Sequence, residues 1–99
     1  MSPNETSATI RAWGEATFGA VADLAVLTGR ARIEFAELEE ALKTGDPGAI
    51  GAEAADIVIL LHRLCGLLDR DLSAEVDAKM AVNRARRWRA SGDGVGEHI

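Results

Sequence analysis

The sequence predicts an all-α protein whose helices pack as a four-helix bundle-like fold. Alanine and leucine are abundant and β-branched residues do not dominate, which favours helix over strand. Apolar residues recur at intervals of three and four, and glycine, proline and aspartate interrupt the apolar stretches. No stretch alternates apolar and polar residues with a period of two, so we expect no strands.

The interruptions divide the chain into four expected helices. They cover residues 7–17, 21–43 and 47–68, with a last helix that reaches Ala90. Gly45 suits the end of the second helix, and Asp46 followed by Pro47 is typical of an N-cap and a first helical position. Asp71 can cap the last helix. The Gly-rich tail, residues 91–99, is expected to be a loop. Short connections predict antiparallel neighbouring helices.

Length and composition limit the class of protein. A chain of 99 residues predicts one domain, residues 1–99, and so small a domain gains stability from a partner chain. The net charge of −5 argues against stable nucleic-acid binding. The single cysteine, Cys65, fits a reducing cytoplasm. We expect no signal peptide, and the longest apolar stretch, Ile57 to Leu61, is too short to cross a membrane.

Carboxylates occur in two pairs on neighbouring predicted helices. Glu34 and Glu37 are three residues apart, and so are Glu53 and Asp56, so each pair lies on one helix face. The turn at Asp46 brings the two helices alongside each other, so the pairs can meet. Four clustered carboxylates repel one another, and a hard cation such as Mg2+ relieves that repulsion. Spacing alone leaves a metal site and a solvated acidic face equally open.

Two neighbouring features fit simpler interpretations. Glu39 and Glu40 are expected to be ordinary solvated side chains. The Glu-x-x-His pairs of di-iron bundles are absent, because position 59 is Ile59 and position 95 is Val95. His62 is therefore expected on a helix surface or at a subunit contact.

Basic residues gather in the last predicted helix. Lys79, Asn83 and Arg86 share a helical face with Arg87. They either complement the helix dipole near its C-terminus or clamp phosphates opposite the carboxylates. Trp13 lies near the end of the first helix, where it can stack on a base or close the end of the core.

The ordered set of motifs resembles the MazG-like all-α nucleoside triphosphate pyrophosphatases. Glu34-x-x-Glu37, fifteen residues and Glu53-x-x-Asp56 match the signature, followed by Lys79-Met80-x-x-Asn83-x-x-Arg86-x-Trp88. The segments RAWGEATFG (residues 11–19) and GDGVGEHI (residues 92–99) are similar to the phage and bacterial dATP/dGTP branch. The family often has adjacent glutamates where this chain has Ile33, which puts in doubt any auxiliary role of the missing acid.

The resemblance implies a reaction and a set of roles. Glu34, Glu37, Glu53 and Asp56 would be the catalytic and metal-binding residues for Mg2+, with Mn2+ as a substitute. Lys79, Asn83, Arg86 and Trp13 would bind the substrate. A (deoxy)nucleoside triphosphate, with dGTP or dATP favoured, would be hydrolysed to the monophosphate and pyrophosphate. The resemblance also implies a homodimer or homotetramer, and we expect it in the cytoplasm of a bacterium or phage-infected cell.

Two other functions stay open at this point. Phosphoribosyl-ATP pyrophosphatase shares the fold, although the N-terminal Trp and Phe-Gly segment and the His-containing tail make it less favoured. A non-catalytic helical oligomerisation or binding module would leave the acids solvated. Binding of Mg2+ at the four acids separates such a module from an enzyme.

Overall fold

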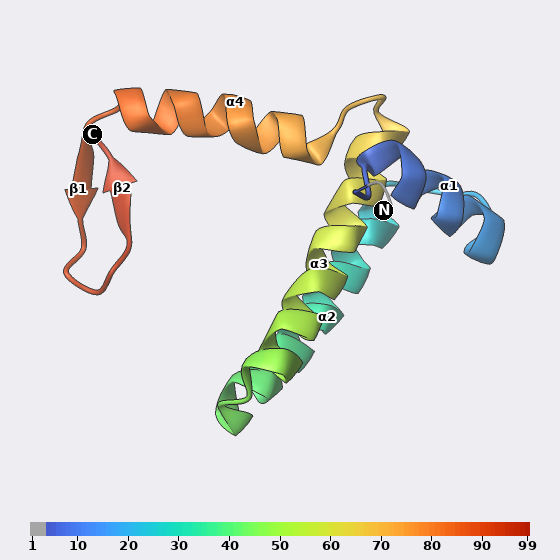
Figure 1. The fold of residues 1–99 in the computed structure, drawn as a ribbon, viewed down its shortest axis with the longest axis horizontal. Coiled ribbons are helices and arrows are strands. Elements are labelled where there is room, and N and C mark those ends of the chain that lie inside the picture. The colour runs from blue at the N-terminus through green and yellow to red at the C-terminus, as the bar shows by residue number, and fades with distance from the viewer. Residues whose placement is uncertain (1–3) are drawn as a thin grey trace.

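The computed structural model describes residues 4–99, which form four helices and a short antiparallel hairpin (Figure 1). The predicted all-α class is confirmed for the body of the molecule. The elements are α1 (Ser7–Phe18), α2 (Ala25–Thr44), α3 (Pro47–Leu67), α4 (Leu72–Ala85), β1 (Trp88–Ala90) and β2 (Gly96–His98).

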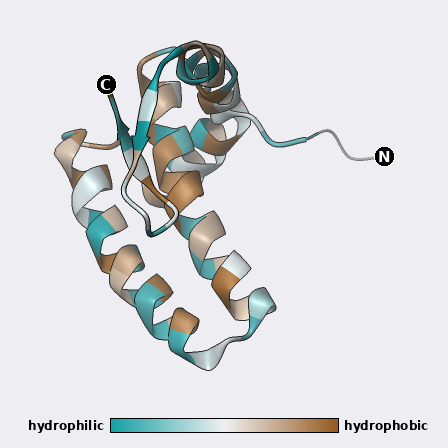
Figure 2. Ribbon diagram, turned by 90° about the vertical axis from the view of Figure 1, so that its left-hand side faces the viewer, coloured by the Kyte–Doolittle hydropathy of each residue, from teal (hydrophilic) through white to brown (hydrophobic). Residues whose placement is uncertain are grey.

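Helices α2 and α3 lie side by side as an antiparallel pair, joined by the tight turn that the sequence predicts (Figures 1 and 2). Gly45 ends α2 with a φ of 69°, a left-handed conformation that glycine adopts without strain. The Asp46 side chain accepts a hydrogen bond from the Gly48 N–H, and Pro47 is the first residue of α3. Helix α2 begins at Ala25 rather than at residue 21, because Asp23 accepts a hydrogen bond from the Ala25 N–H and starts the helix there.

The core is a narrow apolar seam between three helices. Its buried apolar side chains come from α1, α2 and α3, and they are Ile10, Leu27, Ala31, Ala41 and Ile57. Small alanines in this seam let the helix backbones approach closely. Helix α1 packs against α3, and its start is fixed by a capping box between Thr6 and Thr9.

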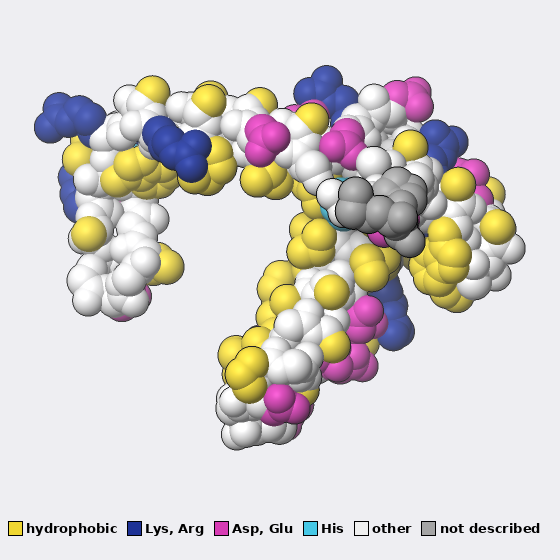
Figure 3. All heavy atoms as spheres, in the orientation of Figure 1, with side chains coloured by type: hydrophobic (Ala, Val, Ile, Leu, Met, Phe, Trp, Pro, Cys, Tyr) yellow, Lys and Arg dark blue, Asp and Glu magenta, His cyan; other side chains and the backbone are white. Residues whose placement is uncertain are grey.

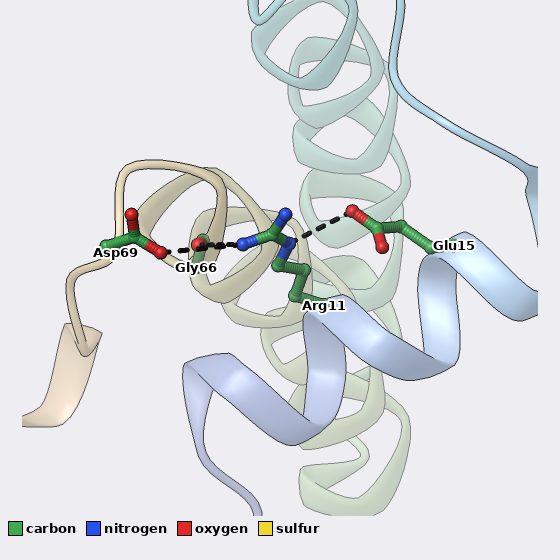
Figure 4. A network of polar contacts seen from close by, with 4 residues as sticks. All are labelled: Arg11, Glu15, Gly66 and Asp69. Carbon is green, nitrogen blue, oxygen red and sulfur yellow. Dashed lines mark hydrogen bonds and ion pairs between the residues drawn. The ribbon is translucent and has the colours of Figure 1, made fainter.

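Arg11 attaches α1 to the end of α3 (Figure 4). Its guanidinium donates to the Gly66 carbonyl at 3.1 Å, pairs with Glu15 at 2.9 Å and reaches Asp69 at 3.6 Å. The Gly66 carbonyl lies in the last turn of α3, where carbonyl groups lack a helical partner. Arg11 is therefore a second donor to a carbonyl that also accepts from the Asp69 N–H, and it joins α1 to the end of α3.

A buried polar network joins the starts of α1 and α4 to α3. Ser7 is fully buried, and its hydroxyl lies 2.8 Å from His62 Nδ1 and accepts from the Leu72 N–H at 2.7 Å. The Ser7 N–H donates to Asp71 Oδ1, and this bond holds the pKa of Asp71 below its usual range. The expectation that His62 lies on a helix surface is wrong, because this network buries it to 8% exposure.

Loss of the Ser7 hydroxyl is expected to destabilise the fold. Ser7→Ala leaves the Leu72 N–H and His62 Nδ1 without a hydrogen-bond partner in the interior. This loss is expected to lower the free energy of unfolding by about 1–3 kcal/mol. Urea denaturation measures this loss. Ser73→Ala, at an exposed position two residues into α4, is the control and should change stability by less than about 0.5 kcal/mol. Equal loss in both variants would contradict a structural role for the network.

Helix α4 leaves the body as an arm, and the hairpin hangs from its far end (Figure 1). None of its residues is buried, although Asp71 caps it as predicted by accepting from the Ala74 N–H. The predicted extension of this helix to Ala90 is wrong: it ends at Ala85, and Trp88–Ala90 is strand β1.

The expected loop at residues 91–99 is likewise wrong in part. Gly96–His98 is strand β2, and it pairs with β1 so that Trp88 faces His98 across the hairpin. Gly92 and Gly94 both have positive φ and form the turn between the strands. Trp88 also donates from Nε1 to the Asn83 carbonyl, which attaches the hairpin to α4.

Apolar side chains line both inner sides of the arch that α3 and α4 make (Figure 3). The exposed apolar residues of these two helices include Val58, Leu61, Val76, Met80 and Val82. A single chain therefore leaves much apolar surface in water. No helix within residues 4–99 has the length and apolar character needed to cross a bilayer.

Candidate active site

Three of the four predicted carboxylates meet between α2 and α3. One carboxylate oxygen from each of Glu34, Glu37 and Glu53 lies within 4.8 Å of the other two. Glu34 is buried, Glu53 is half-buried and Glu37 is exposed. The antiparallel turn at Asp46 produces this meeting, as the spacing of the pairs predicts. Glu39 and Glu40 are exposed on α2, as predicted.

The cluster is negative and only partly compensated. Arg30 pairs with Glu34 Oε1 at 2.9 Å, one turn earlier on α2. A shared hydrogen bond with Glu34 raises the pKa of Glu37, and the negative charges of Glu34 and Glu53 act in the same direction. Arg30 opposes this rise. The metal-free protein therefore carries repulsion that a bound cation would relieve.

The residues present fit a divalent cation. Glu34 Oε2 and Glu53 Oε2 are buried, and neither has a hydrogen-bond partner among residues 4–99. Leaving a buried carboxylate oxygen without a partner is costly, and an oxygen-ligated cation removes that cost. Three carboxylates that converge with two unsatisfied oxygens are the donor set that Mg2+ or Mn2+ accepts.

The raised pKa of Glu37 predicts a pH effect on the metal-free protein. An acid whose pKa is higher in the folded than in the unfolded state binds its proton more tightly when folded. Its contribution to stability is present below the unfolded value and is lost as pH rises through the folded one. In EDTA, raising the pH from the ordinary glutamate range should lower the melting temperature more in the wild type than in Glu37→Gln.

The control for this measurement is Glu39→Gln, which removes an exposed carboxylate of the same helix outside the cluster. It should keep the wild-type dependence on pH. A melting curve series in which Glu37→Gln and the wild type follow the same pH dependence would contradict the proposed repulsion.

A cavity of about 400 Å³ adjoins the cluster. Its lining combines aromatic, apolar, acidic and basic residues: Trp13, Phe18, Arg30, Glu34, Asp56, Ile59, Leu60 and Arg63. Asp56 thus shares the cavity with Glu34 but lies outside the group of three. Trp13 is 54% exposed and meets Phe18 edge to face, with ring centroids 5.5 Å apart. This exposure favours a stacking role for Trp13 over closure of the core.

The other predicted substrate residues lie on the arm. Lys79 and Asn83 belong to α4, but Arg86 follows the end of the helix with an extended ψ of 157°. The predicted shared helical face therefore holds only for Lys79 and Asn83. Within residues 4–99 none of the three lines the cavity beside the carboxylates, and Asn83 Oδ1 is buried without a partner.

Arg30, Arg63 and Phe18 are cavity residues that the sequence reasoning missed. The spacing of Arg30 could have predicted its place beside Glu34, because it lies four residues earlier and so on the same face of α2. The place of Arg63 could also have been predicted, because this residue interrupts a strongly apolar stretch of α3 and lies seven residues after Asp56 on the same helix face. The aromatic pair Trp13 and Phe18 needed the tertiary fold to bring α1 over α3.

A second hollow, of about 600 Å³, lies where α1 meets the end of α3. Arg11, Glu15 and Asp69 line it, and these charges pair with one another. The hollow therefore offers fewer free ligand groups than the cavity beside the carboxylates.

Comparison with known proteins identifies similar proteins of cyanophage S-2L. Over 66 residues the chain is 38% identical to a dATP/dGTP diphosphohydrolase of cyanophage S-2L, which covers 67% of this chain. The chain spans 59% of the length of that relative. No protein-family profile matches the chain.

The fold of this chain is similar to that of the cyanophage S-2L MazG-like pyrophosphohydrolase, whose solved structure is bound to dGDP and three catalytic Mn2+ ions per active site. The TM-score is 0.73 at 31% identity, with 94% of this chain and 88% of that chain covered. The chain belongs to the MazG-like family. The MazG-like resemblance that the motifs indicate is thereby confirmed, and the acid cluster on α2 and α3 is the part of this MazG-like fold that suits a divalent metal.

Proposed function

We propose that the protein hydrolyses a purine (deoxy)nucleoside triphosphate, dGTP or dATP, to the monophosphate and pyrophosphate with Mg2+, which Mn2+ can replace. The observation that carries the proposal is the group of three carboxylates within 4.8 Å, two of which have a buried oxygen without a partner. Two similar proteins of cyanophage S-2L support it: the relative named as a dATP/dGTP diphosphohydrolase, and the solved MazG-like pyrophosphohydrolase bound to dGDP and Mn2+.

Glu34, Glu37 and Glu53 would hold the metal, with Asp56 as a further ligand on the same face of α3, three residues after Glu53. A metal held there would neutralise the triphosphate and make the attacking water more acidic. The water oxygen bonds to the α-phosphorus, the bond from that phosphorus to the bridging oxygen breaks, and pyrophosphate leaves. A carboxylate of the cluster accepts the water proton.

We propose that the arm acts on a second copy of the chain. Lys79, Asn83 and Arg86 do not line the cavity of their own chain, while α4 has no buried residue and exposes Val76 and Met80. A symmetric dimer would cover this apolar surface and place the arm of one chain over the carboxylates of the other. The basic residues of the arm then complement the acid cluster and the phosphates.

An assay of products tests the proposed function. The protein is incubated with Mg2+ and each standard ribo- and deoxyribonucleoside triphosphate, and the products are separated by ion-exchange chromatography. We expect monophosphate and pyrophosphate, fastest from dGTP or dATP, no turnover in EDTA, and recovery when Mg2+ is added back. Diphosphate and inorganic phosphate as products, or turnover that EDTA does not affect, would overturn the proposal.

A further inference from the structure

Arg63 is a buried cation without a partner. It is 9% exposed, and among residues 4–99 its guanidinium makes no hydrogen bond or ion pair. It makes a cation–π contact with Phe18, whose ring centroid lies 5.6 Å from Arg63 Cζ. Buried charged side chains are nearly always paired, whereas the unpaired guanidinium nitrogens of Arg63 keep contact with solvent at the cavity that the residue lines. A guanidinium has five N–H donors, so Arg63 is available to a ligand.

The position of Arg63 in the cavity indicates which part of a bound nucleotide would lie next to it. It lines the same cavity as Glu34 and Asp56 but lies ten residues beyond Glu53 on α3, about 15 Å along the helix axis. If the acid cluster holds the metal and phosphates, as the proposed function requires, then the end of the cavity at Arg63 receives the nucleoside. The phosphates would then bind at the opposite end of the cavity, beside the acid cluster.

The walls near Arg63 fit a flat base better than a sugar. Trp13 and Phe18 offer aromatic surfaces, and Ile59 and Leu60 are apolar. A base stacks on aromatic side chains, while its edge needs hydrogen-bond partners. The fork of an arginine matches two adjacent acceptors, which guanine presents as O6 and N7. Adenine presents N7 alone, and pyrimidines have no N7.

Helix α1 is shaped to leave room for this guanidinium. A Cβ atom on Gly14 would overlap Nε and Cζ of Arg63, so any larger residue there displaces the side chain. Gly14 itself is buried inside a helix, where glycine is otherwise unfavourable. The close approach of α1 thus directs the Arg63 side chain along the cavity.

We infer that Arg63 recognises the purine base of the substrate by donating to N7 and, in guanine, to O6 as well. This inference rests on the proposed function for the placement of the phosphates. It adds the residue and the base atoms through which the site selects purines over pyrimidines and guanine over adenine.

The test compares dGTP with 7-deaza-dGTP, which lacks the N7 acceptor. The wild type should prefer dGTP in kcat/KM by about 5-fold, the lower end of the range for a bidentate arginine contact, because 7-deaza-dGTP keeps O6. Arg63→Met, which keeps the length and the apolar stem, should hydrolyse the two at similar rates. Gly14→Ala, which displaces the guanidinium, should also reduce the preference.

Two matched controls are available. Arg32→Met removes an exposed arginine of α2 that does not line the cavity, and Gly29→Ala adds a Cβ where no atom lies within 4 Å. Both should keep the wild-type preference. A wild type that does not distinguish the two substrates, or an Arg63→Met variant that loses activity on both equally and keeps the preference, would overturn the inference.

Binding without metal separates this inference from the proposed function. Quenching of tryptophan fluorescence, with Trp13 in the cavity, reports the affinity for dGMP and 7-deaza-dGMP in EDTA. Preferred binding of dGMP that Arg63→Met abolishes supports base recognition even if no triphosphate is hydrolysed. Hydrolysis together with equal binding of the two monophosphates would retain the proposed function and reject the role of Arg63.

Discussion

Glu53→Gln is expected to lower nucleotide hydrolysis by at least about 100-fold, because even the outer-shell partners of metal ligands are worth roughly 10–100-fold. The same substitution should leave the melting temperature in EDTA unchanged or higher. Glu53 Oε2 is buried without a partner and lies among the charges of Glu34 and Glu37, so removal of its charge relieves repulsion. Activity is thus expected to fall without any loss of metal-free stability.

Thermal melting with and without Mg2+ makes this result decisive. The wild type should melt at a higher temperature in Mg2+, because a ligand that binds only the folded state stabilises it. Glu53→Gln should lose most of that increase, whereas Glu39→Gln, at an exposed position outside the cluster, should keep it together with full activity. Full activity of Glu53→Gln would overturn the metal site, and a variant that is inactive and also unfolded in EDTA would contradict the predicted relief of repulsion.

The helical body could be predicted because its signals are local. Asp46, Pro47 and Asp71 act within one turn of the helix ends they set, and each occupies its predicted role. The start of α2 and the end of α4 were misplaced for a related reason. Helix propensity continues through residues 21–24 and 86–90, but the hydrogen bond from the Ala25 N–H to the Asp23 side chain and the pairing of β1 with β2 set the observed ends.

The hairpin escaped prediction because its strands are three residues long, too short for alternation of apolar and polar residues to be visible. Gly92 and Gly94 indicate a turn, but a turn alone does not distinguish a loop from a hairpin. Pairing of Trp88 with His98 is a contact between residues ten apart, which helical periodicity does not reveal.

The candidate site likewise contains some residues that local sequence signals predict and others that only the tertiary structure shows. The meeting of Glu34, Glu37 and Glu53 follows from helix spacing and one tight turn, so the sequence sufficed. The role of Arg63 could not be predicted from the sequence, because the burial of this arginine and its lack of a partner are properties of the tertiary structure. The arm residues Lys79, Asn83 and Arg86 differ from both, because they do not line the cavity, and the proposal that places them at a site needs a second chain.

Mixing two inactive variants is expected to restore activity if the arm acts on the partner chain. Glu53→Gln removes the metal site and keeps the arm, whereas Lys79→Ala with Asn83→Ala keeps the metal site and removes the arm. In a mixed dimer one site then combines an intact carboxylate cluster with an intact arm. Random mixing makes half of the dimers mixed, so about a quarter of the wild-type activity should return in a symmetric dimer.

The same mixture distinguishes the opposite arrangement. If each arm served its own chain, every chain in a mixed dimer would lack either the cluster or the arm, and mixing would restore nothing. The chains are co-refolded or co-expressed so that they exchange, and light scattering establishes the oligomeric state. A quarter of the activity in a dimer places Lys79 and Asn83 in the partner's site, whereas no recovery in a mixture shown to contain mixed dimers would reject the shared site.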